Sequence, residues 1–190
     1  RYGKLYRILK PILGIYGTSS IQGKFSVQLE LRKRFLSNGY KIGQIGTEAS
    51  SLLFGFDYDY PMGFNNSVYI HSHDCVRYLN NCINELTKKN CDIIITGSQG
   101  SILPFDVGNI SYFPLRQQVF LQATQPDAVV LCINPFDDSD YIDRSIKYIE
   151  ASVDCKVIAI CVFPFDIDNI SSLLNKRKTL SNERFLELEN

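Results

Sequence analysis

Apolar runs alternate along the chain with segments in which apolar residues recur every three or four positions. The short apolar runs predict β-strands over residues 12–16, 40–45, 91–96, 128–133 and 156–163. The periodic segments between them predict helices over residues 24–38, 73–89, 115–123 and 139–152. This alternation is typical of a parallel sheet that helices cover on both faces. We therefore predict a three-layer α/β fold with a doubly wound, mainly parallel sheet.

Two longer segments interrupt the alternation, over residues 47–67 and 97–114, and both carry glycine with polar and aromatic residues. Loops of that length inside a compact domain usually serve a function, and we expect the first to close as a lid. In doubly wound sheets, ligands bind outside the carboxyl ends of the strands. We therefore expect four loops to converge on one crevice, over residues 17–24, 46–51, 97–101 and 134–137.

The composition suits one α/β domain, because 190 residues with 45% hydrophobic content can bury a sizeable core. We place this domain at residues 11–168, followed by a polar tail over 169–190 in which a terminal helix is one option. The sequence begins at Arg1 without a methionine. We therefore interpret residues 1–10 as a linker from an N-terminal domain that is missing from the sequence, and we expect a homo-oligomer.

Charge and cysteine content limit the kinds of partner and metal site that we expect for this chain. The formal net charge is zero and no basic stripe stands out, which argues against nucleic acid as a partner. No apolar run approaches the roughly 20 residues of a membrane helix, and no signal peptide is visible. The cysteines form no C-x-x-C pair, and no histidine cluster completes a zinc pattern. We predict a cytoplasmic protein without a membrane partner, with buried, reduced thiols at Cys75, Cys82, Cys91, Cys132, Cys155 and Cys161.

The segment GTSSIQGKFS, residues 17–26, follows the first predicted strand and opens the first predicted helix. Glycines let consecutive backbone N–H groups converge on an anion, and the helix that follows presents its positive end. Lys24 can then reach the outer phosphates. The segment thus predicts a phosphate-binding loop and a P-loop NTPase-like fold. The alternative is a glycine-rich turn with an exposed lysine.

The match to the pattern G-x-x-x-x-G-K-[ST] is imperfect. Thr18 stands where the first glycine is expected, with Gly17 one position earlier, and Phe25 takes the place of the hydroxyl that binds Mg²⁺. Ser26 is the candidate substitute. We assign Lys24 a catalytic role, and we assign cofactor binding to Gly17, Thr18, Ser19, Ser20, Gln22, Gly23, Lys24, Phe25 and Ser26.

The loop after the strand at 91–96 reads GSQGS. In many nucleotide hydrolases this strand ends with an acid that holds Mg²⁺, but here it ends at Thr96 and Gly97. We assign Gln99 a catalytic role in orienting a water or binding a phosphate, and Gly100 and Ser101 to cofactor binding. A simple turn is the alternative.

Acids and amides in the remaining loops are further candidates. Glu48 follows the second strand and could bind Mg²⁺, a ribose hydroxyl or an amine, and the sequence leaves Asp57 and Asp59 open as replacements. Asn134 and Asp137 follow the strand at 128–133 with the N-x-x-D spacing of guanine-reading loops, although proline replaces the usual lysine. We assign both to base contact, with the capping of the next helix by a neighbouring residue as the alternative.

Three segments, residues 17–26, 99–101 and 125–128, together resemble a family of domains of unknown function whose characterised branch includes D-glutamate N-acetyltransferase. The resemblance implies a C-terminal P-loop-like domain preceded by another domain, and a hydroxyl one residue late, which suits Ser26. The chain is most similar to a branch associated with clostridial peptide-maturation systems. It departs from the family at Gly97 and Ser98, where the family usually has a glutamate, and at Glu48, where the family tends to have glutamine.

The function we predict is binding of ATP or GTP with Mg²⁺, where Ser26 and Glu48 hold the metal, in a biosynthetic or peptide-maturation protein. The reaction class would be a phosphate-dependent transfer or ligation, with a peptide as one candidate substrate. Two alternatives stay open. The resemblance implies an acyl-CoA-dependent N-acyltransferase that uses acetyl-CoA, and loss of turnover would leave a non-catalytic scaffold domain.

Overall fold

The protein is represented by a computed structural model that describes residues 3–60, 71–163, 165–166, 178–179, 181–183 and 186. Six strands form one sheet in the order β3-β2-β4-β1-β5-β6, and every neighbouring pair is parallel. Their bounds are β1 Ile12–Gly17, β2 Ile42–Gly46, β3 Tyr58–Asp59, β4 Ile93–Gly97, β5 Ala128–Ile133 and β6 Lys156–Val162. β1 lies inside the sheet between β4 and β5, which places the loop that follows it at the middle of the carboxyl edge.

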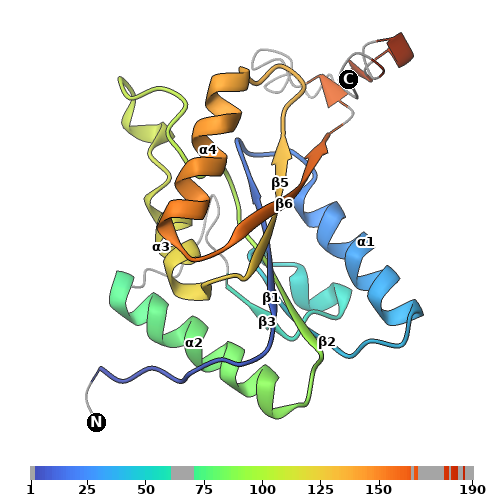
Figure 1. Cartoon of the computed structure of the whole chain (residues 1–190), viewed down its shortest axis with the longest axis vertical. Coiled ribbons are helices and arrows are strands. Elements are labelled where there is room, and N and C mark those ends of the chain that lie inside the picture. The colour runs from blue at the N-terminus through green and yellow to red at the C-terminus, as the bar shows by residue number, and fades with distance from the viewer. Residues whose placement is uncertain are drawn as a thin grey trace.

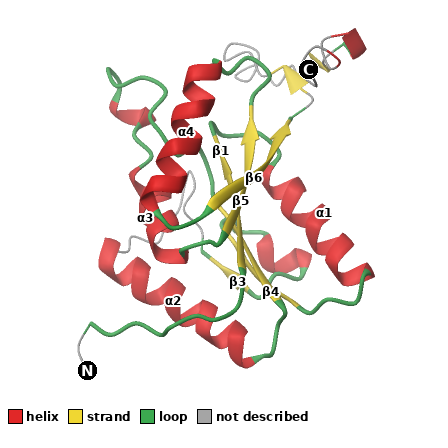
Figure 2. Cartoon of the chain, viewed as in Figure 1, coloured by secondary structure: helices red, strands yellow, loops and turns green. Residues whose placement is uncertain are grey.

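Helices cover both faces of this sheet. Helix α1 (Lys24–Ser37) lies on one face, and α2 (Ser72–Lys88), α3 (Leu115–Thr124) and α4 (Ser139–Ser152) lie on the other (Figures 1 and 2). The predicted three-layer, doubly wound α/β fold is therefore confirmed. The helices begin and end within one residue of the predicted positions, and the apolar periodicity is strong in α2 and α4.

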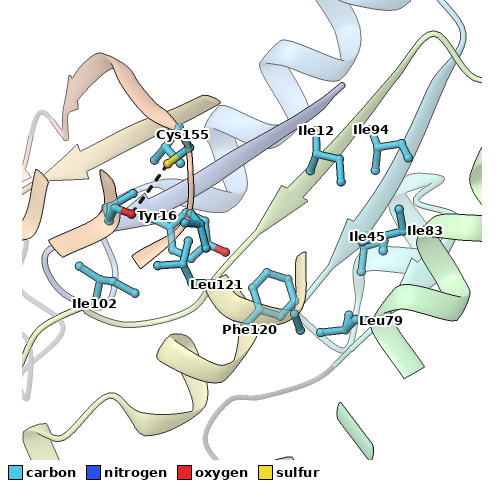
Figure 3. Packing of buried hydrophobic residues seen from close by; sticks show 14 of the residues in the cluster. Ile12, Tyr16, Ile45, Leu79, Ile83, Ile94, Ile102, Phe120, Leu121 and Cys155 are labelled. Carbon is cyan, nitrogen blue, oxygen red and sulfur yellow. Dashed lines mark hydrogen bonds between the residues drawn. The ribbon is translucent and has the colours of Figure 1, made fainter. Parts of the chain in front are cut away.

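The core is divided by the sheet into two clusters. Alternate residues of β1 point to opposite faces, so that Ile12 and Tyr16 pack beneath α2, α3 and α4, whereas Leu13 and Ile15 pack against α1. Figure 3 shows the larger cluster, in which Phe120 of α3 is fully buried. This packing anchors β1 from both sides and fixes the position of the loop that leaves its carboxyl end.

The long segments differ from simple loops. Residues 47–60 contain a short 3-10 helix (Ser51–Phe54) and strand β3, which the sequence pattern did not reveal because β3 is only two residues long. Residues 61–70 lie outside the described residues, so the expected lid stays a prediction. Most of the predicted tail at 169–190 also lies outside them, although a two-residue strand, β7 (Phe165–Asp166), pairs antiparallel with β8 (Lys178–Thr179).

All six cysteines are free, as predicted, and only Cys161 is partly exposed. Burial raises the pKa of each thiol, and it raises the pKa of Cys132 to about 12. Thiols held in the neutral form are poor nucleophiles, which is consistent with a packing role. In the part of the chain that the structure describes, no helix has the length and apolar character needed to cross a membrane.

A buried hydroxyl pair in the larger cluster gives a test of the core. The Thr124 hydroxyl donates to the Phe120 carbonyl at 2.9 Å, so the Tyr16 hydroxyl, 3.1 Å from Thr124, must be the donor of that pair. Tyr16→Phe removes one hydrogen bond and should cost about 0.5–1.5 kcal/mol in the free energy of unfolding. Thr124→Val strands the buried Tyr16 hydroxyl and should cost more, about 1–3 kcal/mol. Urea unfolding measures both, and an equal or larger loss for Tyr16→Phe would contradict the assignment.

Candidate functional site

The loop between β1 and α1 turns into the helix through a left-handed residue. Gly23 has φ 71°, and a side chain there would place its Cβ 2.5 Å from the Phe163 ring at the end of β6. Only glycine meets both the backbone and the space requirement. No side chain caps α1, so its first N–H groups are left for a partner at the positive end of the helix. The geometry is that of an anion-binding helix terminus.

Lys24 is buried, with 6% of its surface exposed, which excludes the exposed lysine of the alternative interpretation. Its Nζ donates to the Ser19 carbonyl at 2.6 Å, so the ammonium is folded back over the loop. Burial lowers the pKa of Lys24 to about 8, against the smaller opposing effects of Cys132 and Glu48. A cation that has lost its water in this way is stabilised by an anion placed in the same loop.

A chain of hydrogen bonds closes the loop on itself. The Ser19 backbone N–H donates to Gln22 Oε1 at 2.9 Å, and Gln22 Nε2 donates to Thr18 Oγ1 at 2.7 Å. The Thr18 hydroxyl in turn donates to the Asp137 carboxylate. Gly17 is required beneath this bridge, because a Cβ there would lie 2.8 Å from Gln22 Oε1. The loop therefore holds its shape through side chains that the sequence pattern treated as variable positions.

Asn134 and Asp137 face the loop rather than open solvent. Asp137 Oδ2 accepts from the Asn134 backbone N–H at 2.8 Å as well as from Thr18, and Asn134 Oδ1 accepts from the Phe136 backbone N–H at 3.0 Å. These bonds anchor the β5–α4 turn to the β1–α1 loop. Contact with a base stays a prediction. The capping of α4 falls to the next residue, Asp138, which accepts from the Asp140 backbone N–H.

Tyr141 of α4 is a further member of the site, and no motif in the sequence points to it. Its hydroxyl lies 3.0 Å from the Thr18 carbonyl and 2.9 Å from the Leu103 carbonyl. Burial raises its pKa to about 12, so the hydroxyl remains a donor. It holds the start of the loop beside the segment that follows β4. The helical spacing of Tyr141 indicates only that its ring is buried. It does not indicate that the buried hydroxyl forms hydrogen bonds to the loop.

The carboxyl end of β4 carries amides and hydroxyls instead of an acid. A side chain at Gly97 would overlap the amide of Gln28, a buried residue of α1. The oxygens Gln28 Oε1, Thr96 Oγ1, Ser98 Oγ and Gln99 Oε1 are buried and have no protein partner. Buried polar atoms of this kind are normally satisfied by water or a ligand. Gln28 therefore fills the space that an acidic residue at the end of β4 would need.

The candidate metal ligands differ in their surroundings. Glu48 is exposed, yet its charge acts on both Lys24 and Asp59. Burial, and then the charge of Glu48, raise the pKa of Asp59, whose Oδ1 is buried without a partner. Asp57 is already engaged by the Gln44 backbone N–H at 3.0 Å and by Lys89 at 3.3 Å. Of the acids that the sequence left open, Asp59 is therefore the one with an unused oxygen.

Phe25 and Ser26 occupy the positions at which the loop pattern places the hydroxyl that binds Mg²⁺. Phe25 packs its ring against Phe54 and Phe56, with centroids 5.3 and 5.4 Å apart, and so serves packing. Ser26 is exposed on the first turn of α1. Among the described residues, no group of three or more His, Cys, Asp or Glu side chains is arranged to hold a metal ion. The roles assigned to Phe25 and Ser26 in cofactor binding stay predictions.

A pocket of about 480 Å³ opens beside the loop. Three of the four loops expected to converge contribute to its lining, through Thr18–Ile21, Gly100–Ser101 and Asn134 with Asp137. The fourth loop, 46–51, is represented at the site by the charge of Glu48 on Lys24 and not by the pocket wall. The segment from Phe105 to Gln117 closes the other side. The carboxyl edge of the sheet thus carries a phosphate-type loop and an adjoining pocket.

The family model of the P-loop domain of unknown function DUF1611_C matches residues 3–178. The chain belongs to this family. A comparison with curated proteins returns no match. Among solved structures, a DUF1611 family protein from Anabaena variabilis is similar with a TM-score of 0.63 and 16% identity, over 85% of this chain and 49% of that protein. The chain therefore spans about half the length of this relative.

Two further solved structures share the fold. The kinase domain of the Escherichia coli tyrosine kinase ETK matches with a TM-score of 0.54 and 13% identity, over 80% of this chain and 67% of that one. A GTPase from Pyrococcus abyssi in its apo form matches with a TM-score of 0.52 and 15% identity, over 94% and 72%. At these identities the likeness establishes the architecture of the domain.

The close approach of Gln28 to Gly97 gives a double-mutant test. Gly97→Ala should destabilise the protein by about 1–3 kcal/mol, because the added methyl group overlaps the buried amide. In a Gln28→Ala background the overlap is gone, and the same substitution should cost at least about 1 kcal/mol less. Thermal or urea unfolding of the four proteins measures the coupling. Equal costs in both backgrounds would show that the backbone, and not Gln28, demands glycine.

Proposed function

We propose that the chain binds the phosphates of ATP or GTP in the loop between β1 and α1. The observation that carries this proposal is Lys24, a buried ammonium held over the uncapped amino end of α1. Desolvation leaves its charge poorly compensated, and a phosphate in the loop would supply the missing counter-charge. The N–H groups of the loop and the helix end are the donors that a phosphate needs.

Mg²⁺ is the metal expected with a nucleotide in such a fold. Glu48 and Asp59 fit a divalent cation, because they are two carboxylates whose charges disfavour one another and one has a buried, unpartnered oxygen. When bound, the ion would neutralise phosphate charge. Ser26 remains the candidate hydroxyl ligand on the first turn of α1. Gln99, whose Oε1 is buried without a partner, would orient a water or the transferred group.

The chain spans about half of its Anabaena relative. Any reaction of the whole protein is therefore proposed as well. The domain would supply a nucleotide-dependent transfer or ligation step in a biosynthetic or peptide-maturation protein. A buried lysine over a phosphate stabilises charge that develops during such a transfer.

Isothermal titration with ATP and with GTP, each with and without Mg²⁺, tests the proposal and identifies the base. Lys24→Met should weaken nucleotide binding by about 10- to 150-fold, the effect of losing one charged hydrogen bond. Lys33→Met is the matched control, because Lys33 is an exposed lysine on the same helix. Binding that is unchanged in Lys24→Met, or absent in the wild-type protein, would refute the proposal.

The lowered pKa of Lys24 predicts a pH dependence of the same binding. Below pH 8 the free protein carries the ammonium that the phosphates require, and as the pH rises through about 8 this proton is lost. Affinity should therefore be highest near pH 7, be about halved at pH 8 and fall further above it, by at most about tenfold per pH unit. The affinity of Lys24→Met should show no such fall. A wild-type affinity that stays level up to pH 9.5 would contradict the assignment.

A second candidate is an acyl-CoA-dependent N-acyltransferase. The observation that favours it is the absence of an acid at the end of β4, where Gln28 occupies the space, together with the packing role of Phe25. A diphosphate of coenzyme A could bind the loop without a metal. Titration with acetyl-CoA discriminates the two: tight binding without Mg²⁺ supports acyl transfer, and Mg²⁺-dependent binding of ATP or GTP alone rejects it.

A further inference from the structure

We propose that the 480 Å³ pocket beside the β1–α1 loop is a second ligand site that takes an uncharged molecule with an aromatic or apolar body and a carboxamide group. This binding is independent of the nucleotide, and it therefore replaces the base contact predicted for Asn134 and Asp137, which line the same pocket. The role of the ligand as acceptor of a transferred group does rest on the proposed function. The argument has three parts: the aromatic wall, the absence of cationic side chains from the lining, and the position next to the loop.

The wall of the pocket is aromatic and well supported. Phe105, Tyr112, Phe113 and Phe136 all line it, and Phe105 is 67% exposed. The Phe105 ring is held between two others, with centroids 6.4 Å from Tyr112 and 5.8 Å from Tyr141. Tyr141 is itself fixed by its hydroxyl bonds to the carbonyls of Thr18 and Leu103. Exposed aromatic rings around a hollow gain free energy when an apolar group covers them.

The polar part of the lining selects against anions. None of the described residues that line the pocket is Lys, Arg or His, and the acid among them, Asp137, accepts through Oδ2 from the Thr18 hydroxyl and the Asn134 backbone N–H. Gln117 contributes an Oε1 atom that is buried without a partner. A carboxamide can donate to Oε1 while it accepts from the Gln117 amide nitrogen. A carboxylate offers acceptors only and would leave its charge uncompensated. The same pocket is therefore a poor site for phosphates or an acidic amino acid.

The position of the pocket connects it to the loop. Ser19 and Ser20 belong to both, and Gly100 and Ser101 close the opposite edge. Lys24 and Gly23, which form the anion-binding end of α1, are not part of the described lining. The phosphate site and the pocket therefore share one wall but have opposite character. A ligand in the pocket would lie next to the outer end of bound phosphates, where an acceptor is needed.

The test compares phenylacetamide with phenylacetate, which have nearly the same shape but differ in charge and in N–H donors. Backbone amide NMR spectra of the ¹⁵N-labelled full chain are recorded as each probe is added. Phenylacetamide should shift the signals of the pocket lining, and phenylacetate should bind at least about fivefold more weakly. A capped peptide, acetyl-Gly-Phe-Gly-amide, tests the source of the carboxamide: binding tighter than phenylacetamide assigns the site to a peptide amide, and weaker binding assigns it to a small molecule.

Two variants locate the interaction. Gln117→Leu should weaken phenylacetamide by at least about fivefold, and Gln122→Leu, which lies on the same helix with its side chain donating to the Ser152 carbonyl, should not. Phe113→Ala should weaken phenylacetamide through the wall and covers the case in which Gln117→Leu does not fold. Equal binding of the two probes, shifts confined to residues outside the pocket, or an unchanged affinity in both pocket variants would overturn the proposal.

The nucleotide serves as an independent check. Saturating ATP or GTP should leave phenylacetamide bound, and displacement would overturn the proposal by assigning the pocket to the base or ribose. If no nucleotide binds and phenylacetamide still does, the proposed function fails while the second site stands; the reverse result removes the second site alone.

Discussion

Burial of the Lys24 ammonium over its own loop is the interaction on which the rest of the site depends. A lysine so placed loses most of its hydration, and within the part of the chain that the structure describes its Nζ donates to the Ser19 carbonyl at 2.6 Å. Gly23 turns the backbone through a left-handed conformation, and the Gln22 bridge joins the Ser19 N–H to Thr18 and Asp137. These hydrogen bonds define the shape of the loop around the buried ammonium.

Hydrogen bonds also connect the β1–α1 loop to neighbouring elements. Thr18 is held by the β5–α4 turn through Asp137 and by α4 through Tyr141, so the loop is fixed to elements that lie beside the aromatic pocket. At the end of β4 the usual acid is replaced by glycine because Gln28 of α1 occupies the space. The site therefore has a buried lysine at the loop, and the acids whose charges act near it, Glu48 and Asp59, lie at the ends of β2 and β3.

Much of the fold could be predicted because its signals are local. Helices α2 and α4 each carry a clear apolar stripe, and β1, β4 and β5 are apolar runs that are buried on both faces, whereas the apolar edge strand β6 is largely exposed. Strand β3 could not be predicted, because two residues carry no periodicity and its pairing with β2 is a long-range contact. For the candidate site, the loop at Gly17–Lys24 and its neighbours near Ser101 and Asp137 were predictable from glycine spacing and strand ends.

The sequence by itself determined the α/β class, the order of strands and helices, and the lysine-bearing glycine loop, because each depends on residues close together in the chain. Only the tertiary structure decided that Lys24 is buried, that Gln28 excludes an acid at Gly97, and that Asp59 rather than Asp57 keeps an unused oxygen. The hydrogen bonds of Tyr141 and the aromatic pocket were also revealed only by the tertiary structure. These features depend on desolvation and on contacts between side chains far apart in sequence. The desolvation and the contacts arise only when the sheet brings the loops together at one edge.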